Sequence, residues 1–102
     1  MVTIHDLLQV MVEKNASDLH IGVGTAPLLR VDGGLFPLRE HGKLDPEMCQ
    51  RLAYGMLNDQ QIKRFEASGE LDLSYGVRGL CRVRVNVYRQ RGTVGVALRN
   101  IP

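Results

Sequence analysis

The spacing of apolar residues predicts a helix at the N-terminus of the chain. Its apolar stripe repeats at i, i+3, i+4 and i+7 and consists of Ile4, Leu7, Leu8 and Met11. Thr3 and Asp6 have the spacing of a capping box, which would start this helix. Lys14 followed by Asn15 suits its C-terminal end.

Three short strands are predicted next, over residues 18–23, 27–31 and 35–38. Asp32-Gly33-Gly34 has the composition of a turn between the second and third of them. Pro37 cannot donate a hydrogen bond to a neighbouring strand. The third strand should therefore be very short or lie at the edge of a sheet.

Two helices follow in the middle of the chain. Residues 45–47, Asp-Pro-Glu, supply an N-cap, a proline at the first position and an acid in the first turn. The apolar stripe of this helix would be Met48, Cys49, Leu52, Ala53 and Met56. A second short helix, which carries Ile62 and Phe65, should begin at Asn58 or Asp59 and end at Gly69.

Strict alternation in the last third predicts a meander of three strands. Residues 70–75 form the first strand, and residues 76–79 turn the chain. The second strand carries Cys81, Val83, Val85 and Val87 on one face and Arg82, Arg84, Asn86 and Tyr88 on the other. The third strand likewise separates Val94, Val96 and Leu98 from Thr93, Gly95, Ala97 and Arg99. The fold class is therefore α+β, with one antiparallel sheet covered by helices on one face.

The hairpin of the last two strands determines which side chains share a face. Residues 89–92 join the strands, so the pair should be antiparallel. The apolar positions are odd-numbered in one strand and even-numbered in the other, so burying both sets requires odd residues to oppose even ones. This register places Arg84 and Arg99 together on the outer face. A slip of one residue would bury arginine.

Charge is unevenly distributed along the chain. The net charge is only +2 among 102 residues, which does not by itself indicate a nucleic-acid-binding protein. Residues 78–99, however, contain no acid and include Arg78, Arg82, Arg84, Arg89, Arg91 and Arg99. An anion, phosphate in particular, is a natural partner for such a segment. The alternative is a solvated basic face with ion pairs to Glu70 and Asp72.

The remaining composition is that of one globular domain. Hydrophobic residues make up 44% of the sequence and charged residues 24%, so one domain with its own core is expected. Cys49 and Cys81 form no CxxC pair, which favours free thiols in a reducing compartment. The N-terminal residues lack the apolar run of a signal peptide or a membrane span.

Three segments together resemble the N-terminal domain of the secretion-ATPase superfamily, most closely its PilT-type pilus retraction members. The first is Ala-Ser-Asp-Leu-His at residues 16–20. The second is Arg-Val-Asp-Gly at residues 30–33. The third is Arg-Val-Arg-Val-Asn at residues 82–86, followed by Arg-Asn-Ile-Pro at residues 99–102. Their order and spacing agree along essentially the whole chain.

The resemblance implies a PAS-like fold in a hexameric motor that uses ATP and Mg²⁺. It implies that ATP binds between this domain and a RecA-like domain of the same or a neighbouring subunit. Arg84 and Arg99, with Arg82 as a further member, would contact the nucleotide phosphates and couple ATP hydrolysis to domain motion. Asp18, His20 and Asn86 would belong to an ordered structural or interface motif.

The chain departs from the superfamily in containing no G-x-x-x-x-G-K-[ST] motif. We therefore expect residues 1–102 to be a single N-terminal domain, or a fragment, that lacks the RecA-like catalytic domain. Alone it should neither hydrolyse ATP nor hold a nucleotide. The resemblance places the whole protein in the cytoplasm, against the inner membrane at the pilus base, with the pilus-base membrane proteins as partners.

Retraction in twitching motility is favoured over pilus extension or type II secretion, because Met1 is followed almost at once by the first helix. Two other classes of function remain as alternatives. One is a nucleic-acid-binding sheet, which is disfavoured because Tyr88 is the only aromatic residue expected on the basic face. The other is a free-standing PAS-like sensor. Asp18 and His20 have the spacing to share a strand face, but no third metal ligand is evident and no metal site is expected.

Overall fold

A computed structural model describes all 102 residues. The chain begins with helix α1 (Ile4–Glu13) and strands β1 (Asp18–Ile21), β2 (Leu28–Val31) and β3 (Gly34–Pro37). A short 3-10 helix, η1 (Arg39–His41), leads to helices α2 (Pro46–Tyr54) and α3 (Asp59–Ser68). Strands β4 (Glu70–Val77), β5 (Cys81–Gln90) and β6 (Thr93–Asn100) complete the fold. Apart from η1, this is the predicted order of elements.

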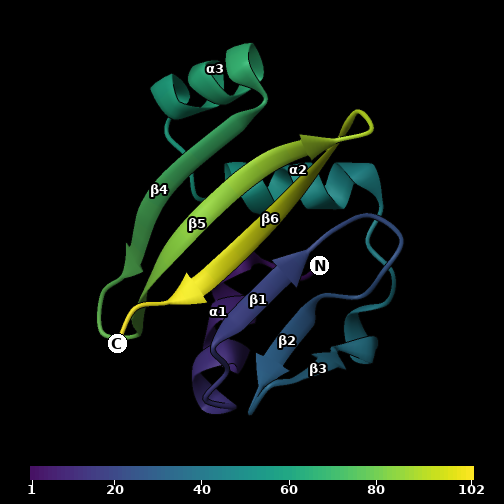
Figure 1. The fold of residues 1–102 in the computed structure, drawn as a ribbon, viewed down its shortest axis with the longest axis vertical. Coiled ribbons are helices and arrows are strands. Elements are labelled where there is room, and N and C mark those ends of the chain that lie inside the picture. Colours follow the sequence, from purple (N-terminus) through teal and green to yellow (C-terminus); the bar gives the residue numbers. More distant parts are fainter.

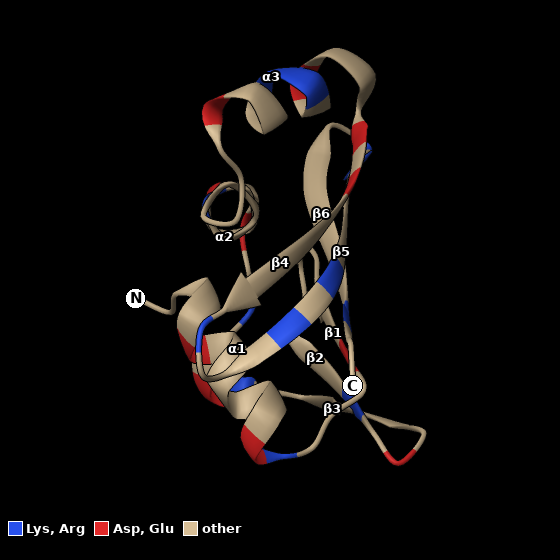
Figure 2. Cartoon of the chain, turned by 90° about the vertical axis from the view of Figure 1, so that its left-hand side faces the viewer, with Lys and Arg blue, Asp and Glu red and all other residues tan.

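The strands form one six-stranded sheet in the order β3-β2-β1-β6-β5-β4, and every neighbouring pair is antiparallel. All the α-helices lie on one side of this sheet, as Figures 1 and 2 show. The predicted α+β class and the single covered face are thus confirmed. Strand β3, which contains Pro37, is at one edge as predicted, and β4 is at the other.

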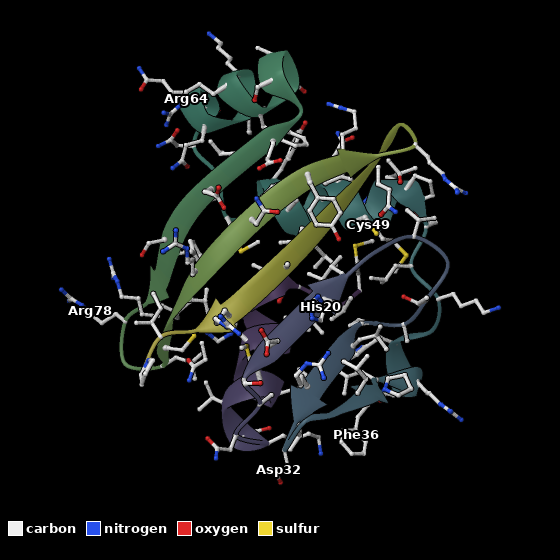
Figure 3. The ribbon with its side chains drawn as sticks, in the orientation of Figure 1. His20, Asp32, Phe36, Cys49, Arg64 and Arg78 are labelled. Carbon is white, nitrogen blue, oxygen red and sulfur yellow. The ribbon has the colours of Figure 1, made fainter.

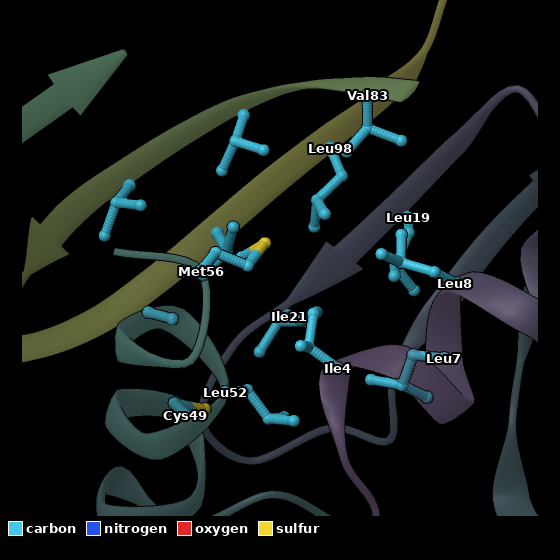
Figure 4. Packing of buried hydrophobic residues seen from close by; sticks show 14 of the residues in the cluster. Ile4, Leu7, Leu8, Leu19, Ile21, Cys49, Leu52, Met56, Val83 and Leu98 are labelled. Carbon is cyan, nitrogen blue, oxygen red and sulfur yellow. The ribbon is translucent and has the colours of Figure 1, made fainter. Parts of the chain in front are cut away.

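The core fills the space between the helices and the sheet. It contains 21 buried hydrophobic residues, which come from helices α1, α2 and α3, from strands β1, β2, β5 and β6 and from the connecting segments. The predicted stripe of α1 is among them. Figure 4 shows side chains from α1 and α2 meeting those of β1, β5 and β6. Burying one such side chain is worth about 1.5–3 kcal/mol, so this layer is the main source of stability.

Side-chain caps mark where the helices begin, and a glycine with positive φ ends α3. Thr3 and Asp6 form the predicted capping box, and the Asp45 side chain accepts a hydrogen bond from the Met48 amide. Asn58 caps α3, and Gly69 ends it with a positive φ of 80°. No helix combines the length and the apolar character that crossing a bilayer requires.

Several predicted boundaries differ from the structure. Strand β1 ends at Ile21 instead of residue 23, because the following segment hydrogen-bonds through Gly24 to the Leu44 carbonyl. Gly76 belongs to β4, where it pairs with Arg82, so the turn between β4 and β5 lies later, over residues 78–80. Met48, which belongs to the predicted apolar stripe of α2, is only half-buried, and Ile62 of α3 is half-buried too.

Candidate functional site

The sheet face turned away from the helices, which we call the outer face, has no covering layer (Figure 2). The strand register aligns side chains across it in rows. One row runs from β2 through β1, β6 and β5 to β4 and consists of Arg30, Asp18, Arg99, Arg84 and Ser74. The neighbouring row in the same direction consists of Leu28, His20, Ala97, Asn86 and Asp72.

Arg84 and Arg99 are direct cross-strand partners in the β5–β6 hairpin. Both are exposed, as the burial pattern of the two strands requires, because Val83, Val85 and Leu98 point into the core. The predicted shared face is therefore confirmed. The tip of the hairpin is a two-residue turn, in which Arg91 and Gly92 both have positive φ.

The other arginines of the basic segment point elsewhere. The guanidinium of Arg89 lies 5.1 Å from the centre of the Phe65 ring, on the helix side of the sheet. Arg78 projects from the β4–β5 turn (Figure 3). Arg82 is on the outer face, but its Nη1 lies only 2.9 Å from where a Cβ on Gly76 would be, so it extends over β4 and away from β6. The structure thus separates one pair of cross-strand partners, Arg84 with Arg99, from Arg82.

Few negative charges balance this pair. Arg99 Nε lies 3.5 Å from Asp18 Oδ1, and Arg84 makes no ion pair. The alternative expectation of ion pairs to Glu70 and Asp72 is not met, because Asp72 instead accepts a hydrogen bond of 3.0 Å from Asn86 Nδ2. Two guanidinium groups directly opposite each other repel unless an anion or an acidic partner lies between them.

A small hollow lies beside Arg84, and Arg99 is not among its lining residues. It has a volume of about 270 Å³ and is lined by Asp72, Leu73, Ser74, Arg84 and Ile101. Ser74 is the β4 partner of Arg84, and its side chain is exposed and makes no hydrogen bond within the protein. A guanidinium and a free hydroxyl side by side are both donors that an anion can use.

Asp18 and His20 share the outer face of β1, as their spacing predicted. Asp18 accepts a hydrogen bond of 2.7 Å from the Ser17 hydroxyl. His20 lines a second hollow, of about 510 Å³, whose lining includes Gln90 and Arg91 at the tip of the β5–β6 hairpin. No three His, Cys, Asp or Glu side chains come together as a metal-binding group.

Sequence reasoning missed two features of the outer face. The first is the contact between Asp18 and Arg99, which depends on the pairing of β1 with β6. No local pattern reveals a contact between strands from opposite ends of the chain. The second is Ser74, whose place beside Arg84 could have been derived by extending the alternation of the meander to the β4–β5 pair.

Comparison with known proteins finds relatives along the whole chain, although no family model matches it. The type IV pilus ATPase PilU of Pseudomonas aeruginosa is 38% identical over 95 residues, which are 93% of this chain and 25% of PilU. The pilus retraction ATPase PilT of the same organism is 38% identical over 103 residues, covering 97% of this chain and 28% of PilT. The chain thus spans about a quarter of the length of these curated relatives.

Solved structures agree with the sequence comparison. A crystal structure of the pilus retraction motor PilT with bound ADP superposes on all of this chain with a TM-score of 0.92 and 38% identity, and the match covers 30% of that protein. The ATPase DotB of Legionella pneumophila has the same fold, with a TM-score of 0.77 at 24% identity. DotB of Yersinia pseudotuberculosis superposes with a TM-score of 0.78 at 19% identity, which likewise speaks for the fold alone.

Proposed function

We propose that the chain is the N-terminal domain of a pilus retraction motor, because it is 38% identical to the type IV pilus ATPases PilU and PilT and superposes on a PilT structure with a TM-score of 0.92. In this proposal Arg84 and Arg99 contact the phosphates of an ATP molecule held mainly by a RecA-like domain of the same or a neighbouring subunit. The residues described supply no phosphate-binding loop and no cluster of metal ligands. They contribute positive charge to a site whose metal and catalytic groups belong to the other domain.

The direct opposition of Arg84 and Arg99 on the outer face carries this proposal. Guanidinium groups bind phosphate oxygens through paired hydrogen bonds, and they do so most strongly where several point at one anion. A loss of γ-phosphate would remove a partner that the two arginines share. Nucleotide hydrolysis would thereby weaken the contact between the two domains, and this couples the chemistry to domain motion in a ring of subunits.

Binding of single-stranded nucleic acid fits the outer face less well. Tyr88 is the only aromatic side chain that the register places there, and its ring packs against Gly95. Proteins of that class offer several stacking surfaces along a basic groove.

Substitution of the paired arginines in the full-length ATPase tests the proposal. Arg84→Ala and Arg99→Ala should each lower kcat/KM for ATP by about 30- to 1,000-fold, because each removes a charged donor from the transition state. Arg91→Ala is the matched control, since Arg91 is exposed in the hairpin turn and away from the pair. Wild-type turnover in both Arg84→Ala and Arg99→Ala, with intact assembly, would refute the assigned role.

A further inference from the structure

The contact between Asp18 and Arg99 has a consequence for phosphate binding. We propose that Asp18 is a positioning residue: it holds Arg99 by Nε and leaves the other edge of the guanidinium directed to a phosphate. This inference rests on the proposed function, because it concerns the same arginine pair. It goes further in giving a role to a carboxylate that does not itself touch the nucleotide.

Asp18 is a fixed anchor. Its side chain is only 16% exposed, and one carboxylate oxygen, Oδ2, accepts the 2.7 Å hydrogen bond from the Ser17 hydroxyl. The other oxygen, Oδ1, faces Arg99 Nε at 3.5 Å. Arg99 is 76% exposed and would otherwise be free to sample many rotamers. The ordered partner therefore restrains the mobile one.

The choice of Arg99 is selective. Asp18 lies between two arginines in the sheet, since it pairs with Arg30 on β2 and with Arg99 on β6. Arg30 is engaged elsewhere, because its Nη1 donates a hydrogen bond of 3.0 Å to the Gly33 carbonyl in the β2–β3 turn. Asp18 consequently forms its ion pair with Arg99 and makes none with Arg30. If Asp18 served only to neutralise positive charge on the outer face, it could pair equally well with Arg30 or with Arg99.

Contact between Asp18 and Nε of Arg99 leaves the rest of the guanidinium available for phosphate. A guanidinium carries one N–H on Nε and four on its two terminal nitrogens. Contact through Nε leaves the edge formed by the terminal nitrogens open to bind two phosphate oxygens at once. Asp18 also lies on the side of Arg99 opposite to Arg84, because the strand order is β1-β6-β5. Its attraction draws Arg99 away from Arg84 and keeps space for an anion between them.

A double-mutant cycle in the full-length ATPase tests this role. Asp18→Asn should lower kcat/KM for ATP by about three- to ten-fold, because the neutral amide holds Nε less strongly. In an Arg99→Ala background the same substitution should change kcat/KM by less than about two-fold, because nothing remains to be positioned. Glu70→Gln is the control, since Glu70 is an exposed carboxylate in β4 and pairs with no arginine.

Arginine side-chain NMR of the 102-residue chain tests the contact itself. The Nε chemical shift of Arg99 should differ between the wild type and Asp18→Asn, because the carboxylate 3.5 Å away is replaced by a neutral amide, and Glu70→Gln should leave it unchanged. Three results would overturn the proposal: equal loss from Asp18→Asn with and without Arg99, increased kcat/KM in Asp18→Asn, or an Arg99 signal insensitive to Asp18. These results differ from those that would refute the proposed function. If the arginines do not contact phosphate, Arg84→Ala and Arg99→Ala would themselves keep wild-type kcat/KM.

Discussion

The ring of Tyr88 lies directly over Gly95, its cross-strand partner in the β5–β6 hairpin. A Cβ on Gly95 would come within 2.5 Å of Tyr88 Cε2 and 2.7 Å of Cζ. The glycine thus provides the space that the aromatic ring occupies on the outer face. Aromatic residues compensate in this way for glycines, which otherwise weaken a strand.

The effect of Gly95→Ala on the free energy of unfolding should depend strongly on whether Tyr88 is present. Gly95→Ala alone displaces the Tyr88 ring, which offsets the gain of about 0.5–1 kcal/mol expected from replacing glycine in a strand. In a Tyr88→Ala background no ring is displaced, so Gly95→Ala should stabilise the fold by about that amount. Free energies of unfolding from urea titration should give a coupling of about 1 kcal/mol or more. Simple additivity would contradict the packing described here.

Gly69 should be the most sensitive glycine at a helix end. It ends α3 with φ of 80°, and its amide donates to the Phe65 carbonyl at 2.7 Å. Gly69→Ala forces a side chain into the left-handed region and should cost about 1–2 kcal/mol in unfolding free energy.

Gly22→Ala is the matched control for Gly69→Ala. Gly22 lacks a positive φ, and a Cβ there would meet nothing within 4 Å. Thermal or urea unfolding should place this variant within about 0.5 kcal/mol of the wild type. Equal destabilisation by the two substitutions would show that backbone conformation is not the cause.

The capping box of α1 should make stability depend on pH at the acid end. The Thr3 backbone N–H and then the Thr3 hydroxyl hold the pKa of Asp6 below its ordinary value, because both interactions favour the carboxylate. A lowered pKa in the folded state means that the unfolded chain takes up a proton first as pH falls. The stabilisation is therefore present above about pH 4 and is lost as pH falls through the folded-state pKa.

Asp6→Asn removes this titration. Unfolding free energies measured from pH 2 to pH 6 should fall less steeply at the acid end in Asp6→Asn than in the wild type, since the amide caps the helix without binding a proton. Parallel pH profiles for the two proteins would mean that Asp6 contributes no linkage.

The arginine pair could be derived from the sequence because the alternation is unbroken on both strands of the hairpin. Once Val83, Val85 and Leu98 are buried together, Arg84 and Arg99 must share the outer face. Their direct opposition follows from the two-residue turn, which places Gln90 opposite Thr93. The order of elements could be derived for a similar reason, because its signals are also local. Asp45, for example, marks the start of α2.

Contacts between distant elements could not be derived in the same way. Asp18 meets Arg99 only because β1 inserts next to β6, which is a matter of sheet order and not of local pattern. Arg82 shares its strand face with Arg84, yet its guanidinium turns to Gly76 on β4. Alternation predicts the face of a side chain, but not the direction in which a long side chain extends across it.

A structure of the full-length ATPase with a non-hydrolysable ATP analogue is the most direct test of the central claim. The account predicts guanidinium nitrogens of both Arg84 and Arg99 at about 2.7–3.2 Å from terminal phosphate oxygens. It is contradicted if the nucleotide is bound and ordered while both side chains remain in solvent or pair with acidic residues elsewhere.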